Sequence, residues 1–136
     1  MGFEKFGRIN FTVQGKTADF VANLEHGRVT TTRCKQCGQE YFPPRADCSA
    51  CLSNNMEWFD INTKGKLLSF TKAMYAPLGF EADVPYTLGV AQFGKVKVFG
   101  RLSKGIADSE VRVGMEVKAE PVKLPGDRVS YELTKA

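Results

Sequence analysis

Residues 33–51 read RCKQCGQEYFPPRADCSAC and contain all four cysteines of the chain. The cysteines form two Cys-x-x-Cys pairs, Cys34 with Cys37 and Cys48 with Cys51. Two residues between thiols let both sulfurs of a tight turn face one ion, and two such turns supply the tetrahedron of thiolates that Zn²⁺ accepts. The pattern predicts a zinc site with no open coordination position, which is typical of a structural ion.

Two other uses of the cysteines stay open. Disulfides are disfavoured because residues 1–20 carry charges throughout and lack the apolar segment of a secretory signal. An iron centre of the rubredoxin type also uses paired Cys-x-x-Cys turns, and Gly38 follows the first pair as such a turn prefers. Leu52 follows the second pair, which lacks the Pro and Gly usual in iron centres. This difference favours zinc.

Length and composition indicate an ordinary soluble protein. The chain has 136 residues, of which 43% are hydrophobic and 25% charged, and no stretch approaches the length of a membrane helix. We therefore expect a cytoplasmic protein that binds no membrane. The formal net charge is +4, and four thiolates with one Zn²⁺ would lower it to about +2. A net positive charge this small does not require a nucleic-acid partner.

The chain before the cysteines predicts an extended arm over residues 1–15 and a short helix over residues 17–25. Thr17 is placed to cap this helix, and Phe20, Val21 and Leu24 share one face. We expect three parts in all. They are the arm and helix (1–28), a rubredoxin-like zinc ribbon (29–56) and a barrel domain (57–136).

Residues from 57 onward alternate like strands and are punctuated by glycines. The pattern predicts five short strands, and this number favours a small Greek-key barrel of the OB type. The fold class is therefore mainly β with one short N-terminal helix. The expected strands cover residues 66–75, 86–93, 95–102, 115–124 and 128–134.

The third expected barrel strand is the best candidate binding surface. Alternation places Val96 and Val98 inward, and one aromatic and three basic side chains outward. Such a face can stack on a ring and meet phosphates, so it suits coenzyme A or a single-stranded nucleic acid. A solvated face with the ring covered by a neighbouring segment is an equal alternative. The outward residues are Lys95, Lys97, Phe99 and Arg101.

A long loop over residues 76–85 carries apolar side chains, among them Leu78 and Phe80. These side chains must fold back on the barrel or reach a partner, and two prolines stiffen the loop for docking. We therefore expect a partner contact here.

We find no catalytic constellation in the sequence. His26, the one histidine, stands at the expected helix end without a nucleophile beside it, and no Gly-rich phosphate loop is present. We therefore expect that the chain alone is not an enzyme.

The ribbon motif, Phe42-Pro43-Pro44-Arg45 between its two pairs, and Gly65-Lys66 before the barrel closely resemble the zinc-ribbon/OB-fold family of acyl-CoA-associated proteins. The resemblance implies a non-catalytic subunit that holds and shapes a thiolase-like enzyme acting on a β-ketoacyl-CoA such as benzoylsuccinyl-CoA. It also implies a coenzyme A thioester as ligand of the complex, and metal ligation by Cys34, Cys37, Cys48 and Cys51. The alternative is a zinc-ribbon/OB module that binds single-stranded nucleic acid.

Overall fold

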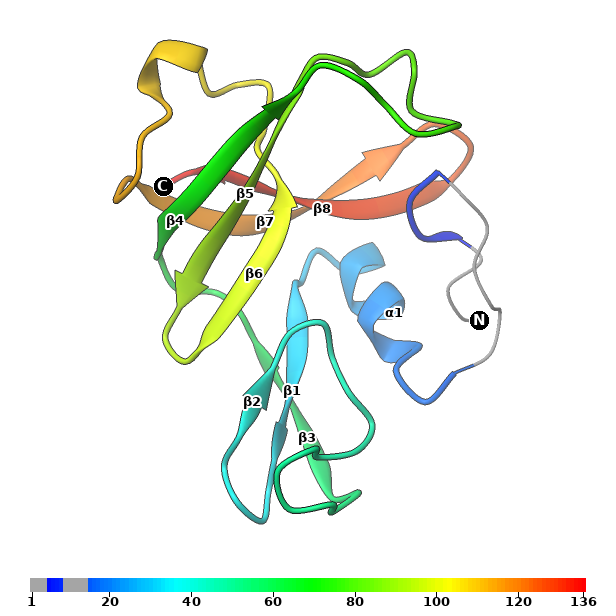
Figure 1. Cartoon of the computed structure of the whole chain (residues 1–136). Coiled ribbons are helices and arrows are strands. Elements are labelled where there is room, and N and C mark those ends of the chain that lie inside the picture. The colour runs from blue at the N-terminus through cyan, green and yellow to red at the C-terminus, as the bar shows by residue number, and fades with distance from the viewer. Residues whose placement is uncertain (1–4, 9–14) are drawn as a thin grey trace. The chain divides into compact units, whose positions relative to one another are not determined.

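The computed structural model describes residues 5–8 and 15–136 (Figure 1). The chain divides into two compact units, residues 1–62 with 121–130 and residues 63–120 with 131–136. Most of the expected N-terminal arm lies outside the described residues.

The first unit begins with helix α1 (Asp19–Glu25), which buries Phe20, Val21 and Leu24 as its apolar spacing predicts. The prediction that Thr17 caps the helix is wrong. Ala18 occupies the N-cap with helical dihedral angles and without a side-chain hydrogen bond, because a turn leads directly into the helix. Within the described residues, no helix is long and apolar enough to cross a membrane.

A three-stranded antiparallel sheet completes the ribbon, with strand order β2-β1-β3. Its strands are β1 (Thr30–Cys34), β2 (Glu40–Tyr41) and β3 (Met56–Asp60). The central strand β1 buries three consecutive threonines, whose hydroxyl groups bond to Asn23, to the Tyr41 carbonyl and to the Arg45 backbone. These bonds satisfy polar groups that would otherwise be costly to bury. The threonines are Thr30, Thr31 and Thr32.

The first unit also includes two chain segments that are far apart in sequence. Phe6 bridges Val129 in parallel, and the Gly7 amide donates to the Val129 carbonyl at 2.8 Å. Lys5 forms an ion pair with Asp127 at 3.1 Å. The segment 121–130 therefore belongs to the ribbon unit, although it includes the turn between two strands of the larger sheet.

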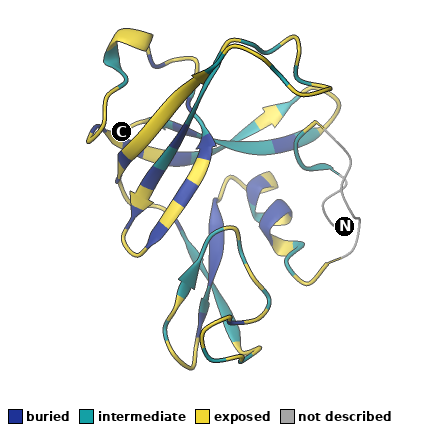
Figure 2. Cartoon of the chain, in the orientation of Figure 1, coloured by how far each residue is buried: buried dark blue, intermediate teal, exposed yellow. Residues whose placement is uncertain are grey.

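The second unit carries the five-stranded antiparallel sheet, with strand order β6-β5-β4-β7-β8. The bridge from Leu102 to Leu133 links the end of β6 to β8 and closes the sheet. Its centre is apolar, with Leu67, Val98, Val117 and Leu133 fully buried. Figure 2 shows buried and exposed residues alternating along β6. The strands are β4 (Gly65–Ala73), β5 (Tyr86–Phe93), β6 (Val96–Arg101), β7 (Glu116–Leu124) and β8 (Arg128–Lys135).

These elements confirm the mainly β fold with a ribbon followed by an OB-type barrel. The expected barrel strands agree with the observed bounds to within two residues. The sequence analysis missed β3, whose five residues are all only half-buried and are fixed by pairing with β1. The expected division into residues 1–28, 29–56 and 57–136 stays a prediction.

Gly65 gives a direct test of how tightly the barrel is packed. A Cβ atom at this position would lie 2.6 Å from the Gln92 carbonyl oxygen and 2.8 Å from the Phe93 ring. We expect Gly65→Ala to lower the free energy of unfolding by about 1–3 kcal/mol, because backbone and a buried ring must move. Urea denaturation measures the change.

The matched control is Gly105→Ala, where the nearest atom to the added methyl group is the Ser103 hydroxyl oxygen at 3.5 Å. We expect this variant to stay within about 0.5 kcal/mol of the unaltered protein. Equal stability of the two variants would show that the barrel accommodates a side chain at Gly65.

Candidate metal centre

Two turns of matching geometry carry the four cysteines. In the first, the Gly38 amide donates to the Cys34 carbonyl at 2.9 Å. In the second, the Leu52 amide donates to the Cys48 carbonyl at 3.0 Å. Gly38 and Leu52 both have positive φ, 80° and 64°. The second turn therefore places leucine in a conformation that glycine adopts more easily.

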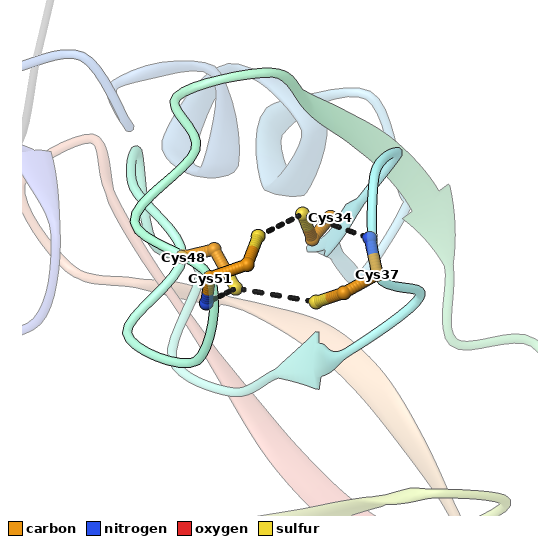
Figure 3. A group of neighbouring side chains, drawn as sticks. All are labelled: Cys34, Cys37, Cys48 and Cys51. Atoms are coloured by element: carbon orange, nitrogen blue, oxygen red, sulfur yellow. Dashed lines mark hydrogen bonds between the residues drawn. The ribbon is translucent and has the colours of Figure 1, made fainter.

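The four sulfur atoms point toward one another (Figure 3). The Sγ atoms of Cys34 and Cys51 are 3.5 Å apart, as are those of Cys37 and Cys48, and all four lie within 4.8 Å of one another. A zinc tetrahedron with Zn–S bonds of about 2.3 Å has sulfur–sulfur edges of about 3.8 Å, so the cluster fits this ion closely. The distances are too long for disulfides, and all four cysteines are free.

The surroundings favour thiolates at the two buried positions. Cys34 and Cys48 are each 1% exposed. The backbone amide of Cys37 donates to Cys34 Sγ and is the main reason that the pKa of Cys34 is lowered. The Tyr41 hydroxyl lies 3.1 Å from Cys48 Sγ and is the main reason that the pKa of Cys48 falls to about 6. Both shifts prepare ligands that bind metal only when deprotonated.

This donor set has the chemistry of a structural site. Four cysteine sulfurs fill all positions of a tetrahedral ion and leave none for water or substrate. When bound, zinc would supply a fixed cross-link between the two turns. Arg33 reinforces the sheet beside it, with ion pairs to Glu40 at 3.2 Å and to Glu57 at 3.0 Å.

The outer side of β6 has the expected alternation. Val96 and Val98 are buried, while Lys97 is exposed and Phe99 is 55% exposed. Lys95 lies exposed in the turn before the strand. No ion pair is found for either lysine among the described residues, so this end of the strand is open and cationic.

Arg101 differs from the other residues proposed for this surface. Its guanidinium group forms an ion pair with Asp83 at 3.0 Å and lies 4.2 Å from the centre of the Tyr86 ring. Arg101 therefore ties β6 to the loop 76–85, an interaction that the sequence analysis did not anticipate.

The two loop residues proposed for partner contact have different surroundings. Leu78 is 88% exposed, whereas Phe80 is half-buried and its amide donates to the Pro77 carbonyl at 3.0 Å. Just before the loop, Tyr75 is 92% and Met74 is 61% exposed. The sequence analysis did not single out these two residues.

Metal content tests the centre. We expect the purified chain to contain one zinc ion and Cys48→Ser to lose it, because three thiolates bind zinc less tightly than four. Structural zinc contributes on the order of 10 kcal/mol to folding, so the variant should also lose the ordered ribbon. Elemental analysis and thermal unfolding measure both effects.

Ser109→Ala, in the exposed 3-10 turn Asp108–Glu110, is the control and should keep both the zinc and the ordered ribbon. Iron, or empty sulfurs in native material, would contradict the zinc assignment.

Two archaeal proteins are similar to this chain over about two thirds of its length. A DUF35 domain-containing scaffold protein of Methanocaldococcus jannaschii is 32% identical over 101 residues, 70% of each chain. A scaffold protein of the same description from Pyrococcus furiosus is 33% identical over 94 residues, 69% of this chain and 68% of the relative. The benzoylsuccinyl-CoA thiolase subunit BbsA of Thauera aromatica is 31% identical over 71 residues, 52% of this chain and 48% of BbsA.

Two solved structures share the fold. A chain of the Ltp2-ChsH2(DUF35) aldolase superposes with a TM-score of 0.76 at 18% identity, covering 92% of this chain and 98% of the other. A DUF35 protein of unknown function from Sulfolobus solfataricus superposes with a TM-score of 0.61 at 17% identity, covering 90% of this chain and 89% of the other.

Family models match both parts of the chain. Residues 22–57 match the rubredoxin-like zinc ribbon domain of ChsH2, and residues 58–121 match the C-terminal OB-fold domain of ChsH2. The cysteine cluster lies within the first match. This protein is therefore a member of the DUF35 family, built from a zinc-ribbon domain and an OB-fold domain that match the models of the two ChsH2 domains.

Proposed function

We propose that this chain is the scaffold subunit of a heteromeric acyl-CoA enzyme whose catalytic residues belong to a thiolase-like partner. Its archaeal relatives are described as scaffold proteins, BbsA as a thiolase subunit, and the ChsH2 structure as part of an aldolase. The reaction would be the CoA-dependent cleavage, or the reverse condensation, of a β-ketoacyl-CoA. Benzoylsuccinyl-CoA is the substrate that the name of BbsA suggests.

The structural observation that carries this proposal is a group of exposed side chains in residues 74–78, between the end of β4 and the first part of the loop 76–85. Met74, Tyr75 and Leu78 are large apolar side chains that are 61%, 92% and 88% exposed. Aromatic and methionine side chains are enriched at the centres of protein interfaces. Met74 and Tyr75 belong to this class, and with Leu78 they expose three large side chains within five positions, which suits a contact with a partner protein.

The same loop is held in shape before any partner binds. Asp83 near its end forms the ion pair with Arg101, and both side chains are less than one quarter exposed. The Gly79 amide donates to the Glu81 carboxylate at 2.8 Å. A loop fixed in this way loses little conformational entropy on docking.

Replacement of the exposed side chains tests the loop. We expect Tyr75→Ser combined with Leu78→Ser to weaken binding of the thiolase-like subunit on the order of 100-fold, because two interface anchors are removed. The unfolding midpoint should stay unchanged, since neither side chain is buried. The measurement uses the complex isolated from the native cell and titration calorimetry with its separated subunits.

Val113→Ser is the matched control, since Val113 is 63% exposed in a turn elsewhere in the same unit. It should bind like the unaltered chain. If the variant with both Tyr75→Ser and Leu78→Ser bound with full affinity, this would contradict the loop contact. A complex without a thiolase-like subunit, or turnover of an acyl-CoA by the isolated chain, would contradict the proposed function itself.

The outer side of β6 is the proposed contact for coenzyme A. Phe99 offers an exposed ring for the adenine, and Lys95 and Lys97 offer cations for the phosphates. Arg101 contributes less to this surface than its position on the strand suggests, because Asp83 already neutralises it.

Charge reversal at the lysines tests this contact. We expect Lys95→Glu combined with Lys97→Glu to raise the KM of the complex for its CoA thioester about tenfold or more and to leave kcat unchanged, since only binding is affected. The same reversal at Lys118 and Lys123 on β7 is the control. An unchanged KM would contradict the contact. Salt-sensitive binding of a single-stranded nucleic acid, lost in the first variant, would favour the alternative function.

A further inference from the structure

The Tyr41 hydroxyl contacts the cluster of four cysteines but is not one of the expected metal ligands. Tyr41 ends β2, and its main chain is fixed by pairing with Thr32 on β1. Its hydroxyl oxygen lies 3.1 Å from Cys48 Sγ and 3.1 Å from the Ser49 hydroxyl, and it accepts the Ser49 amide proton at 2.9 Å. One side chain therefore joins β2 to the turn that carries the second cysteine pair.

The direction of the hydroxyl proton follows from the groups around it. A metal-bound Cys48 thiolate has no proton and can only accept a hydrogen bond. The Ser49 amide can only donate, so it occupies a lone pair of the Tyr41 oxygen. The Ser49 hydroxyl can donate to that oxygen as well. With Tyr41 donating to Cys48 Sγ, all of these groups are satisfied at once.

This hydrogen bond distinguishes two otherwise equivalent ligands. Cys34 and Cys48 are both 1% exposed, and each accepts one amide proton from the cysteine three residues later, at 3.5 Å and 3.4 Å. Among the described residues, only Cys48 also has a side-chain hydroxyl group within hydrogen-bond distance. The second turn thus has an additional constraint that the first turn lacks.

We propose that Tyr41 is a positioning residue of the metal centre, whose hydroxyl donates to Cys48 Sγ, holds this sulfur in place for the ion and makes it slow to leave. A hydrogen bond to a thiolate spreads its charge and lowers its nucleophilicity. Groups that orient metal ligands in this way typically change metal affinity 10- to 100-fold. The inference concerns the isolated chain and does not depend on the proposed function.

Tyr41→Phe tests the proposal because it keeps the ring and removes only the hydroxyl. We expect the full zinc-loaded chain to transfer its metal to an excess of a chromogenic chelator at least about tenfold faster. Alkylation with iodoacetamide, followed by mass mapping, should show Cys48 labelled earlier relative to the exposed Cys37. Ser109→Ala removes a hydroxyl group from an exposed position in the 3-10 turn Asp108–Glu110 and should behave like the unaltered chain.

Ser49→Ala separates the two partners of the hydroxyl group. It leaves the Tyr41 bond to sulfur intact, so metal transfer should stay within about twofold of the unaltered chain if the proposal holds. If Ser49→Ala transferred its metal as fast as Tyr41→Phe does, Tyr41 would act through Ser49, and the proposal would be wrong. Unchanged transfer in Tyr41→Phe would also overturn it.

A spectroscopic measurement on the unaltered chain keeps the test independent of any variant. In the cadmium-loaded protein, the Tyr41 hydroxyl proton should give a slowly exchanging resonance that is scalar-coupled to the metal through Cys48 Sγ. A hydroxyl proton that exchanges freely with water and shows no such coupling would contradict the hydrogen bond to the thiolate.

Discussion

Four cysteine sulfurs within 4.8 Å of one another cannot all be ionised without a cation among them. The ribbon around them is built from short elements. Its sheet includes a strand of only two residues, and its helix has seven. The ion that the cysteines are arranged to bind would therefore determine whether this unit folds, because metal-binding free energy and folding free energy are the same quantity in such a site.

The barrel depends on a different constraint, the close approach of its own strands. Gly89 and Gly100 lie where a Cβ atom would be 2.6 Å from Leu102 and 2.9 Å from Tyr131. Packing this tight gives a rigid support, and the Arg101–Asp83 pair extends that rigidity to the loop after β4. The apolar residues Tyr75 and Leu78 are thus exposed on a well-supported loop.

Patterns that repeat along the sequence were readable without coordinates. Two Cys-x-x-Cys pairs identify the metal cluster, and glycines between alternating segments identify the barrel strands, because both signals are local. Pairing across the fold was not readable. Met56–Asp60 is a strand because β1 lies beside it, and Arg101 is neutralised by an aspartate that is 18 residues away. The bond from Tyr41 to Cys48 likewise depends on which way the second turn folds.

The chain passes between its two units three times, after residues 62, 120 and 130. Val129 in the second segment of the ribbon unit bridges Phe6 in its first segment. A fragment that ends at residue 62 would therefore lack part of its own unit. No single cut in the chain therefore separates the ribbon unit from the barrel unit, because each unit is built from two segments with a segment of the other unit between them.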